Sequence, residues 1–223
     1  MSKTLSPEEH DAYDRSARRM DIAETWLEAV TFIRPLRRRA WEAARGRLIL
    51  EVGVGSGRGF PFHPHEARVV AFDFSPKMLR KAVGRAAKMG LSADLLLADV
   101  NYLPFKTGTF DTALATFVFC MPPDPVASLS EVARACRPEG QIVLLEHVRP
   151  RNWLLGKAAD LLEKMTARGG EHVNRETAKC LRETGAEIVH EERHRMGIVE
   201  LMQARPAATG AAIAEGVDDV VAS

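Results

Sequence analysis

Hydrophobic residues follow two different spacings between residues 47 and 148. Short runs of consecutive apolar residues alternate with longer stretches in which apolar residues recur every three or four positions. Runs of the first kind predict strands buried on both faces, and stretches of the second kind predict amphipathic helices. The predicted strands are 47–52, 67–74, 93–100, 109–119 and 141–148, and the predicted helices are 76–90 and 125–140. This strand–helix alternation predicts a parallel sheet with helices on both faces.

The regions on either side of this core show other patterns. Residues 1–46 are expected to be helical, with a break or kink at Pro35. After Pro150 the pattern predicts two helices, 152–168 and 174–185, and two closing strands, 186–195 and 197–206. The remaining segment is rich in glycine and alanine and is expected to be a disordered tail. We therefore divide the chain into an N-terminal helical lid at 1–46, a main domain at 47–206 and a tail at 207–223.

Size and composition narrow the class of protein. The 223 residues suffice for one α/β domain with an added segment. The net charge of +1 provides no global attraction to nucleic acid or to an anionic membrane. Three dispersed cysteines without a CxxC pair argue against a disulfide framework and a zinc site. The first residues are too polar for a signal peptide, and no apolar run reaches the roughly 20 residues that cross a bilayer, so we expect a cytoplasmic protein.

A glycine-rich turn follows the first predicted strand, in LILEVGVGSGRG. Gly53, Gly55 and Gly57 permit a tight turn and close approach of a ligand to the backbone. A helix N-terminus after such a turn would favour a carboxylate or a phosphate. A dinucleotide fingerprint would need glycine where Arg58 stands, which disfavours a nicotinamide cofactor.

Polar side chains follow the next strands at the same edge of the predicted sheet. Asp73 ends the second strand, where a carboxylate can accept both hydroxyls of a ribose. Asp99 follows the third strand and can accept from an exocyclic amine such as that of adenine. The fourth strand delivers Thr116 and Phe117 to the same crevice. Each aspartate has an alternative interpretation as a turn or helix-cap residue.

These segments together resemble the motifs of class I S-adenosylmethionine-dependent methyltransferases. The resemblance rests on EVGVGSG, FDFSPKML, ADVNYLPF, FDTALA and RPEGQIVLLEH, which occur in the family's order between residues 48 and 147. It implies a Rossmann-like fold with a seven-stranded, mostly parallel sheet, helices on both faces and an N-terminal helical lid. It also implies S-adenosylmethionine as cofactor and S-adenosylhomocysteine as product.

The resemblance further implies a set of cofactor-binding residues. The glycine loop would lie under the methionine part, with Glu51 near its amino end, Asp73 at the ribose and Asp99 at the adenine. The complete set is Glu51, Gly53, Gly55, Gly57, Asp73, Phe74, Ser75, Met78, Asp99, Val100, Thr116 and Phe117.

A finer resemblance is to the branch of ubiquinone/menaquinone-biosynthesis and phospholipid N-methyltransferases. It rests on AYDRSARRMD, where Met20 replaces a usual tyrosine, and on FVFCMPPDP, LLEHVRP, GEHVNRET and GIVELMQARP. It favours a phospholipid amine head group of the phosphatidylethanolamine type as acceptor. C-methylation of a quinone precursor and S-methylation of a small thiol remain alternatives. From other classes, a nicotinamide-dependent oxidoreductase and a non-catalytic cofactor-binding module stay open. Nucleic acid is not expected as a partner, since CMPPDP does not match the catalytic tetrapeptide of nucleic-acid methyltransferases.

Methyl transfer can proceed by positioning alone, and the sequence contains no metal-ligand cluster. An amine acceptor must lose its proton before it attacks, which requires a base or a route to solvent. The candidate catalytic residues are Tyr13, Cys120 and His147. Each has a plain alternative as a packing, filler or strand-end residue. His172, Asn174 and Arg175 in GEHVNR are further candidates, or the start of a helix.

Two interpretations fit the aromatic and basic residues near the N-terminus, which are Trp26, Phe32, Trp41, Arg34, Arg37, Arg38 and Arg39. They could form a peripheral contact with an anionic membrane through the N-terminal helix. Alternatively, the apolar residues pack on the sheet and the arginines form the solvated face of the lid. The sequence leaves the oligomeric state open.

Overall fold

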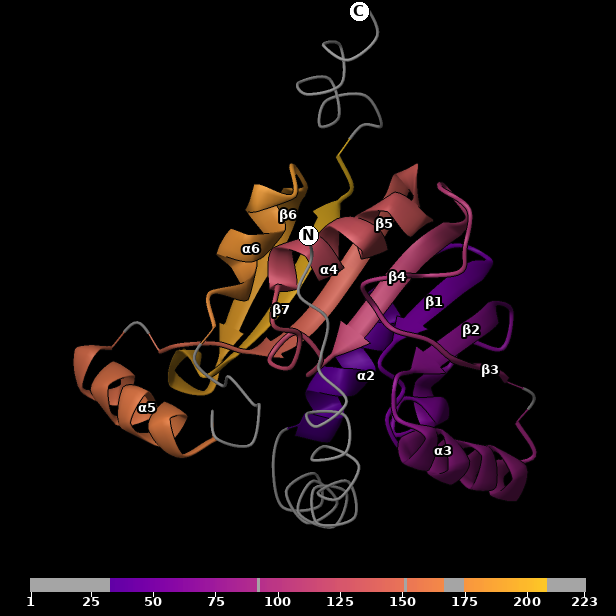
Figure 1. Ribbon diagram of the computed structural model, residues 1–223, viewed down its shortest axis with the longest axis horizontal. Coiled ribbons are helices and arrows are strands. Elements are labelled where there is room, and N and C mark those ends of the chain that lie inside the picture. Colours follow the sequence, from indigo (N-terminus) through magenta and orange to yellow (C-terminus); the bar gives the residue numbers. More distant parts are fainter. Residues whose placement is uncertain (1–32, 92, 151, 167–174, 208–223) are drawn as a thin grey trace, which may run out of the picture.

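The computed structural model describes residues 33–91, 93–150, 152–166 and 175–207 (Figure 1). Within these ranges seven strands form one sheet in the order β3-β2-β1-β4-β5-β7-β6. The strands are β1 (Leu48–Val52), β2 (Arg68–Asp73), β3 (Asp94–Leu97), β4 (Phe110–Thr116), β5 (Cys136–His147), β6 (Glu187–His194) and β7 (Val199–Arg205). The helices are α2 (Ile33–Ala43), α3 (Pro76–Met89), α4 (Pro125–Ala135), α5 (Trp153–Thr166) and α6 (Thr177–Glu183), with short 3₁₀ turns η1 (Phe60–Phe62) and η3 (Arg195–Gly197).

The sheet is parallel except at β7, which runs antiparallel to both β5 and β6. The parallel neighbours need long crossovers, whereas β6 and β7 are joined by the short turn η3 and therefore pair antiparallel. The predicted fold, a seven-stranded, mostly parallel sheet with helices on both faces, is confirmed. All seven predicted strands are present.

Local sequence signals explain most helix boundaries. The Ser75 hydroxyl caps α3 by accepting the Met78 N–H at 3.2 Å, as expected, and α3 ends at Gly90 with φ of +63°. Asp124 caps α4 in the same way, through the Ala127 N–H at 3.0 Å. The segment 125–140 was predicted as a helix that ends in a proline–glycine stop, and the helix ends earlier than expected, at Ala135, with β5 beginning at Cys136. Pro138 explains the early end, because it disfavours helical backbone in the residue before it.

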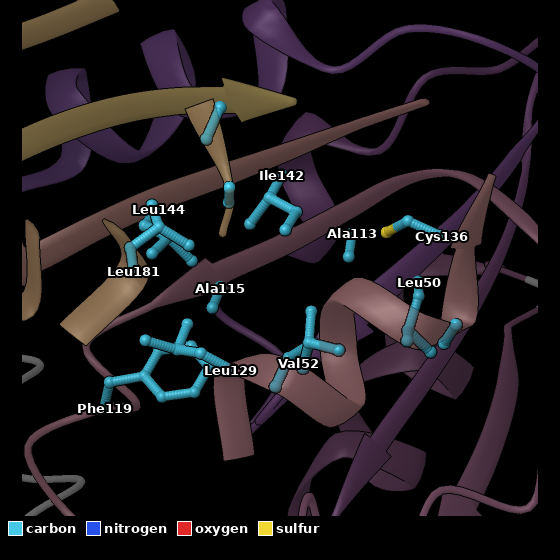
Figure 2. Close-up of a cluster of buried hydrophobic side chains, with 14 of the residues drawn as sticks. Leu50, Val52, Ala113, Ala115, Phe119, Leu129, Cys136, Ile142, Leu144 and Leu181 are labelled. Atoms are coloured by element: carbon cyan, nitrogen blue, oxygen red, sulfur yellow. The ribbon is translucent and has the colours of Figure 1, made fainter. Parts of the chain in front are cut away.

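Two apolar layers hold the helices against the sheet. On one face, α4 and α6 contribute Leu129 and Leu181 to a cluster with side chains of β1, β4 and β5, and Figure 2 shows them pointing into the same space. On the other face, α2 packs on the sheet through Leu36 and Trp41, and α3 packs through Ala82 and Ala86. The carboxyl ends of the central strands are left between these layers.

Helix α2 is the described part of the predicted N-terminal lid. Pro35 lies in its first turn, where the missing N–H costs little and the helix continues. Trp41 is only 2% exposed and packs in the core, which agrees with the interpretation that the apolar residues pack on the sheet and not with a membrane contact of this side chain. Residues 1–32 and the tail from 208 lie outside the described residues, and the division into lid, domain and tail stays a prediction. No described helix is both long and apolar enough to cross a membrane.

Candidate active site

A cleft opens at the carboxyl edge of the sheet, where β1 to β4 end. Its empty volume is about 880 Å³, including the part open to solvent. Of the twelve predicted cofactor-binding residues, all except Glu51, Gly57 and Ser75 line it. The lining residues in the described part of the chain are Arg37, Val52, Gly53, Val54, Gly55, Ser56, Arg58, Phe72, Asp73, Phe74, Met78, Ala98, Asp99, Val100, Asn101, Thr116, Phe117, Val118, Met121 and Pro122.

The glycine loop forms the floor of the cleft. Gly53 and Gly55 have φ of +67° and +55°, in the left-handed region that favours glycine. A Cβ at Gly53 would lie 2.6 Å from a methyl group of Val118, so glycine lets the loop after β4 pack closely. A Cβ at Gly55 would meet no atom within 4 Å. The backbone at Gly55 therefore faces open space that a ligand can fill.

The three predicted residues that do not line the cleft have other neighbours in the structure. Glu51 is 3% exposed, and its Oε2 lies 2.9 Å from Nε2 of His63. Gly57 makes room for the ring of Phe60, which would be 2.4 Å from an added Cβ. Ser75 is buried as the cap of α3. None of the three lines the cleft, and their role in binding a cofactor stays a prediction.

Asp73 is fixed at the end of β2 by two backbone donors. Its Oδ2 accepts the Gly55 N–H at 2.8 Å, and its Oδ1 accepts the Ser75 N–H at 2.9 Å. The side chain is 3% exposed and lines the cleft. A carboxylate oxygen has more than one lone-pair site, so both oxygens can accept further bonds from a ligand's hydroxyl pair.

Asp99 is oriented by its own turn. Its Oδ1 accepts the backbone N–H of Asn101 at 2.9 Å and the side-chain Nδ2 of Asn101 at 2.8 Å. Phe74, Met78 and Val100 line the cleft with it and supply apolar surface. This combination of a carboxylate and apolar side chains suits a flat ring with an exocyclic amine.

The loop after β4 forms the opposite wall and contains a strained residue. Phe117 has φ of +59°, which is uncommon for a bulky residue and costs on the order of 1–3 kcal/mol. Its N–H donates to the Leu145 carbonyl at 2.8 Å, and its ring lies 4.4 Å from that of His147. These contacts hold the backbone of Phe117 at this positive φ, and the loop after β4 then continues along the cleft.

Two buried arginines of the cleft were not predicted as site residues. Arg37 and Arg58 are each 7% exposed and line the cleft. The Arg37 guanidinium donates to Oγ1 of Thr116 and lies 5.7 Å from the centre of the Phe117 ring.

The assignment of Arg37 to a surface cluster of arginines was wrong. It lies on the buried side of α2, at helical spacing from the buried residues Ile33, Ala40 and Trp41, and that spacing could have revealed it. Its neighbours Arg38 and Arg39 are exposed instead, and pair with Glu42 and Glu192.

Of the candidate catalytic residues, the structure describes Cys120 and His147, and neither lines the cleft. His147 does not line the cleft, and burial lowers its pKa to about 4, so it is neutral at physiological pH. Cys120 is buried, with Sγ 3.8 Å from the Phe117 carbonyl, while Met121 and Pro122 line the cleft next to it. Tyr13, His172 and Asn174 lie outside the described residues. A catalytic role for Tyr13, Cys120 or His147 stays a prediction.

Within the described ranges, no group of three or more His, Cys, Asp or Glu side chains is arranged to hold a metal ion. The charged groups lining the described cleft are Asp73, Asp99, Arg37 and Arg58. Such a cleft can bind a ligand with hydroxyl, amine and anionic groups, and it can align a reaction between two bound molecules.

Comparison with known proteins gives consistent matches. A family model described as "Methyltransferase domain" matches residues 50–144. A phosphatidylethanolamine N-methyltransferase of Cereibacter sphaeroides is 38% identical over 141 residues, covering 62% of this chain and 70% of the relative. A human thiol S-methyltransferase is 32% identical over 103 residues, covering 45% of this chain and 42% of the relative. The chain thus matches less than half the length of the human protein.

Solved structures share the fold at low sequence identity. An S-adenosylmethionine-dependent methyltransferase of Thermotoga maritima has a TM-score of 0.68 and 19% identity, over 87% of this chain and 99% of that one. A geranyl diphosphate methyltransferase, solved with GPP and sinefungin, has a TM-score of 0.63 and 12% identity, over 77% of each chain. At these identities the likeness concerns the fold.

Proposed function

Because the chain belongs to the class I S-adenosylmethionine-dependent methyltransferases, we propose that it methylates the amine head group of a phospholipid of the phosphatidylethanolamine type. The observation that carries this proposal is the extent of the similarity to the Cereibacter sphaeroides enzyme. That similarity covers 141 residues and 70% of the relative, against 103 residues and 42% for the human thiol methyltransferase.

S-Adenosylmethionine is the cofactor, and the cleft fits it. The open space at Gly55 suits a ligand lying on the loop backbone, and the fixed carboxylate of Asp73 suits a ribose. We assign Asp99 and its apolar neighbours to the adenine and the loop at Gly53–Gly55 to the methionine part. When bound, the cofactor supplies a methyl group activated by a sulfonium.

The remaining part of the cleft is proposed to hold the acceptor. Phe117, Val118, Met121 and Pro122 give it an apolar wall. Orientation in such a site can provide about 7–11 kcal/mol of the barrier reduction. The described cleft lining contains no histidine or cysteine. We therefore propose that the ammonium group loses its proton to solvent before the neutral amine attacks.

A lipid acceptor is further supported by the surface of α5. Trp153, Leu154 and Leu161 are 60–66% exposed, and the Lys157 ammonium lies 5.0 Å from the centre of the Trp153 ring. Figure 1 shows α5 standing to one side of the sheet. Exposed aromatic and aliphatic side chains next to a lysine suit the surface of an anionic bilayer. A small soluble thiol would not need such a surface.

The test begins with calorimetric titration of the protein with S-adenosylhomocysteine, followed by labelled S-adenosylmethionine and three acceptors. These are vesicles containing phosphatidylethanolamine, a small aliphatic thiol and a lipid extract containing quinone precursors. Label in the phospholipid fraction supports the proposal. Label on the thiol or the quinone, with none on the phospholipid, overturns it and selects the corresponding alternative.

A further inference from the structure

We propose that Glu146 is a positioning residue for methyl transfer, which fixes the loop after β4 so that Phe117 and Val118 form the wall of the cleft. Glu146 does not line the cleft, and it would act through the backbone of that loop. The inference rests on the proposed function only for the acceptor used in its kinetic test.

Glu146 satisfies two consecutive backbone donors of the loop. It lies near the end of β5 and is fully buried. Its Oε1 accepts the Val118 N–H at 2.9 Å and the Phe119 N–H at 3.2 Å. Buried N–H groups need an acceptor, and the loop between a strand and a helix has no ladder partner to supply one. One carboxyl oxygen of Glu146 therefore replaces the backbone acceptors that a neighbouring strand would provide.

The loop needs this support because Phe117 is strained. A bulky residue with φ of +59° persists when the residues around it hold it in place. On one side the Phe117 N–H donates to the Leu145 carbonyl, and on the other side Glu146 holds the next two N–H groups. The side chain of Phe119 anchors the loop in the core next to Leu129, as Figure 2 shows.

The same loop reaches the cofactor side of the cleft through Val118. A methyl group of Val118 packs so closely on Gly53 that a Cβ there would be 2.6 Å away. A shift of the loop would therefore move the acceptor wall and the floor under the methionine part together. Misplacement by about 1 Å is enough to reduce a rate about 100-fold.

The strength of the two hydrogen bonds from Val118 and Phe119 depends on whether Glu146 is ionised. Burial raises its pKa to about 7, although the N–H groups of Val118 and Phe119 and the charge of Arg175 oppose the shift. Directly across the strand pair lies Glu200, whose carboxylate is bonded to Arg193. An ionised carboxylate accepts more strongly than its protonated form. The loop should be held most firmly above pH 7, and activity should decline as the pH falls through this value.

The test compares Glu146→Gln and Glu146→Leu with the wild type, and uses Glu200→Gln as the matched buried control. The amide ¹H shifts of Val118 and Phe119 are followed by NMR between pH 5.5 and 8.5, without an acceptor. In the wild type and in Glu200→Gln we expect both shifts to titrate near pH 7. In Glu146→Gln this titration should be absent. Identical titration in Glu146→Gln and the wild type would overturn the inference.

Kinetics with phosphatidylethanolamine vesicles provide the second readout. We expect kcat/KM to fall about 10- to 100-fold in Glu146→Leu, with partial rescue in Glu146→Gln because the amide oxygen can still accept. The part of the pH dependence that Glu146 causes near pH 7 should be lost in both variants, while the slope that comes from deprotonation of the acceptor amine should remain. Equal kcat/KM in folded Glu146→Leu and the wild type would contradict the inference. If the wild type does not methylate this lipid, the proposed acceptor is wrong, and the amide titration alone decides the role of Glu146.

Discussion

Glu146 of β5 lies directly opposite Glu200 of β7, and both side chains are fully buried. Residues opposite each other in an antiparallel pair point to the same face, here the one covered by α4 and α6. Burial raises the pKa of both carboxyls. Their bonds differ, because Glu146 accepts from two loop amides and Glu200 accepts from Nε of Arg193 at 2.6 Å. Glu146 thus supports the loop that forms the cleft wall, whereas Glu200 belongs to an ion pair with Arg193.

The first prediction concerns folding stability in Glu146→Gln. The pKa of Glu146 is about 7 in the folded protein, above its ordinary value of 4.5. Its contribution to stability is therefore fully present below pH 4.5 and is lost as the pH rises to 7. That loss amounts to about 3 kcal/mol. Urea unfolding at a series of pH values should show that the free energy of unfolding of Glu146→Gln, relative to that of the wild type, rises by this amount between pH 4.5 and 7. A difference between the two proteins that stays constant with pH would contradict the prediction.

The second prediction separates two glycines of the same loop. Alanine at either position adopts an unfavourable positive φ, which costs about 1–2 kcal/mol. In Gly55→Ala the new methyl group enters the empty cleft, so affinity for S-adenosylhomocysteine should fall by about tenfold or more. In Gly57→Ala it collides with the ring of Phe60, so stability should fall further than in Gly55→Ala. Calorimetry and thermal unfolding measure the two effects, and equal loss of affinity in both variants would argue against the assigned geometry.

The strands of the sheet could be predicted from the sequence because each strand has a local signal. Apolar runs such as that at Leu48–Val52, and the Ser75–Pro76 start of α3, depend on nearby residues alone. The start of β5 was misplaced, at residue 141 instead of Cys136, because the pairing of Cys136 with Phe110 is a long-range contact. Helical periodicity does not report such contacts.

The site was predicted where function depends on the ends of strands, as at Asp73 and Asp99. The prediction missed a cleft residue whose side chain extends from a helix that packs on the sheet. Arg37 lies on α2 and reaches Thr116, 79 positions away in the chain, so its helical spacing indicates that it is buried but not that it lies in the cleft. Glu51 fits the sequence motif, yet its carboxylate pairs with His63 and does not line the cleft. The direction of a side chain at a strand end depends on packing partners that the sequence does not name.

The third prediction compares two neighbouring arginines of α2. Arg37→Met removes the donor to Thr116 and the cation over Phe117, and leaves a half-buried hydroxyl without this partner. We expect kcat/KM to fall by about tenfold or more, since a hydrogen bond to a charged group is worth roughly 1.5–3 kcal/mol. Arg38→Met removes an exposed ion pair with Glu42 and should remain within about twofold of the wild type. Equal activity of the two variants would show that Arg37 has no part in the cleft.

The fourth prediction addresses the surface of α5. The double variant Trp153→Ser, Leu161→Ser should sediment less with vesicles of phosphatidylethanolamine and phosphatidylglycerol, by about tenfold or more in partition. The control is Val83→Ser on α3, which removes an apolar side chain that is 54% exposed. Binding should also weaken with added salt, because Lys157 lies beside Trp153. Unchanged sedimentation of the double variant would remove α5 from the proposed lipid contact.

The fifth prediction concerns His147. Burial lowers the pKa of this residue, whereas it raises the pKa of the adjacent Glu146. Burial lowers the pKa of His147 from 6.5 to about 4, so folding favours the neutral ring. The stability that it contributes is present above pH 6.5 and is lost as the pH falls to 4, by about 3 kcal/mol. Between pH 6.5 and 4.5, Glu146 changes stability in the opposite direction. The two contributions therefore largely cancel in the wild type.

The variant His147→Phe, which keeps a ring against Phe117, should expose the contribution of Glu146. Its stability relative to the wild type should rise as the pH falls from 6.5 to 4.5, whereas that of Glu146→Gln should fall over the same interval. In the double variant the two changes should cancel, because each group titrates on its own account. Urea unfolding of the four proteins measures this cycle. If His147→Phe follows the wild-type curve, the ring is protonated in the folded protein at the same pH as in the unfolded chain, and its place behind Phe117 is not the apolar one described.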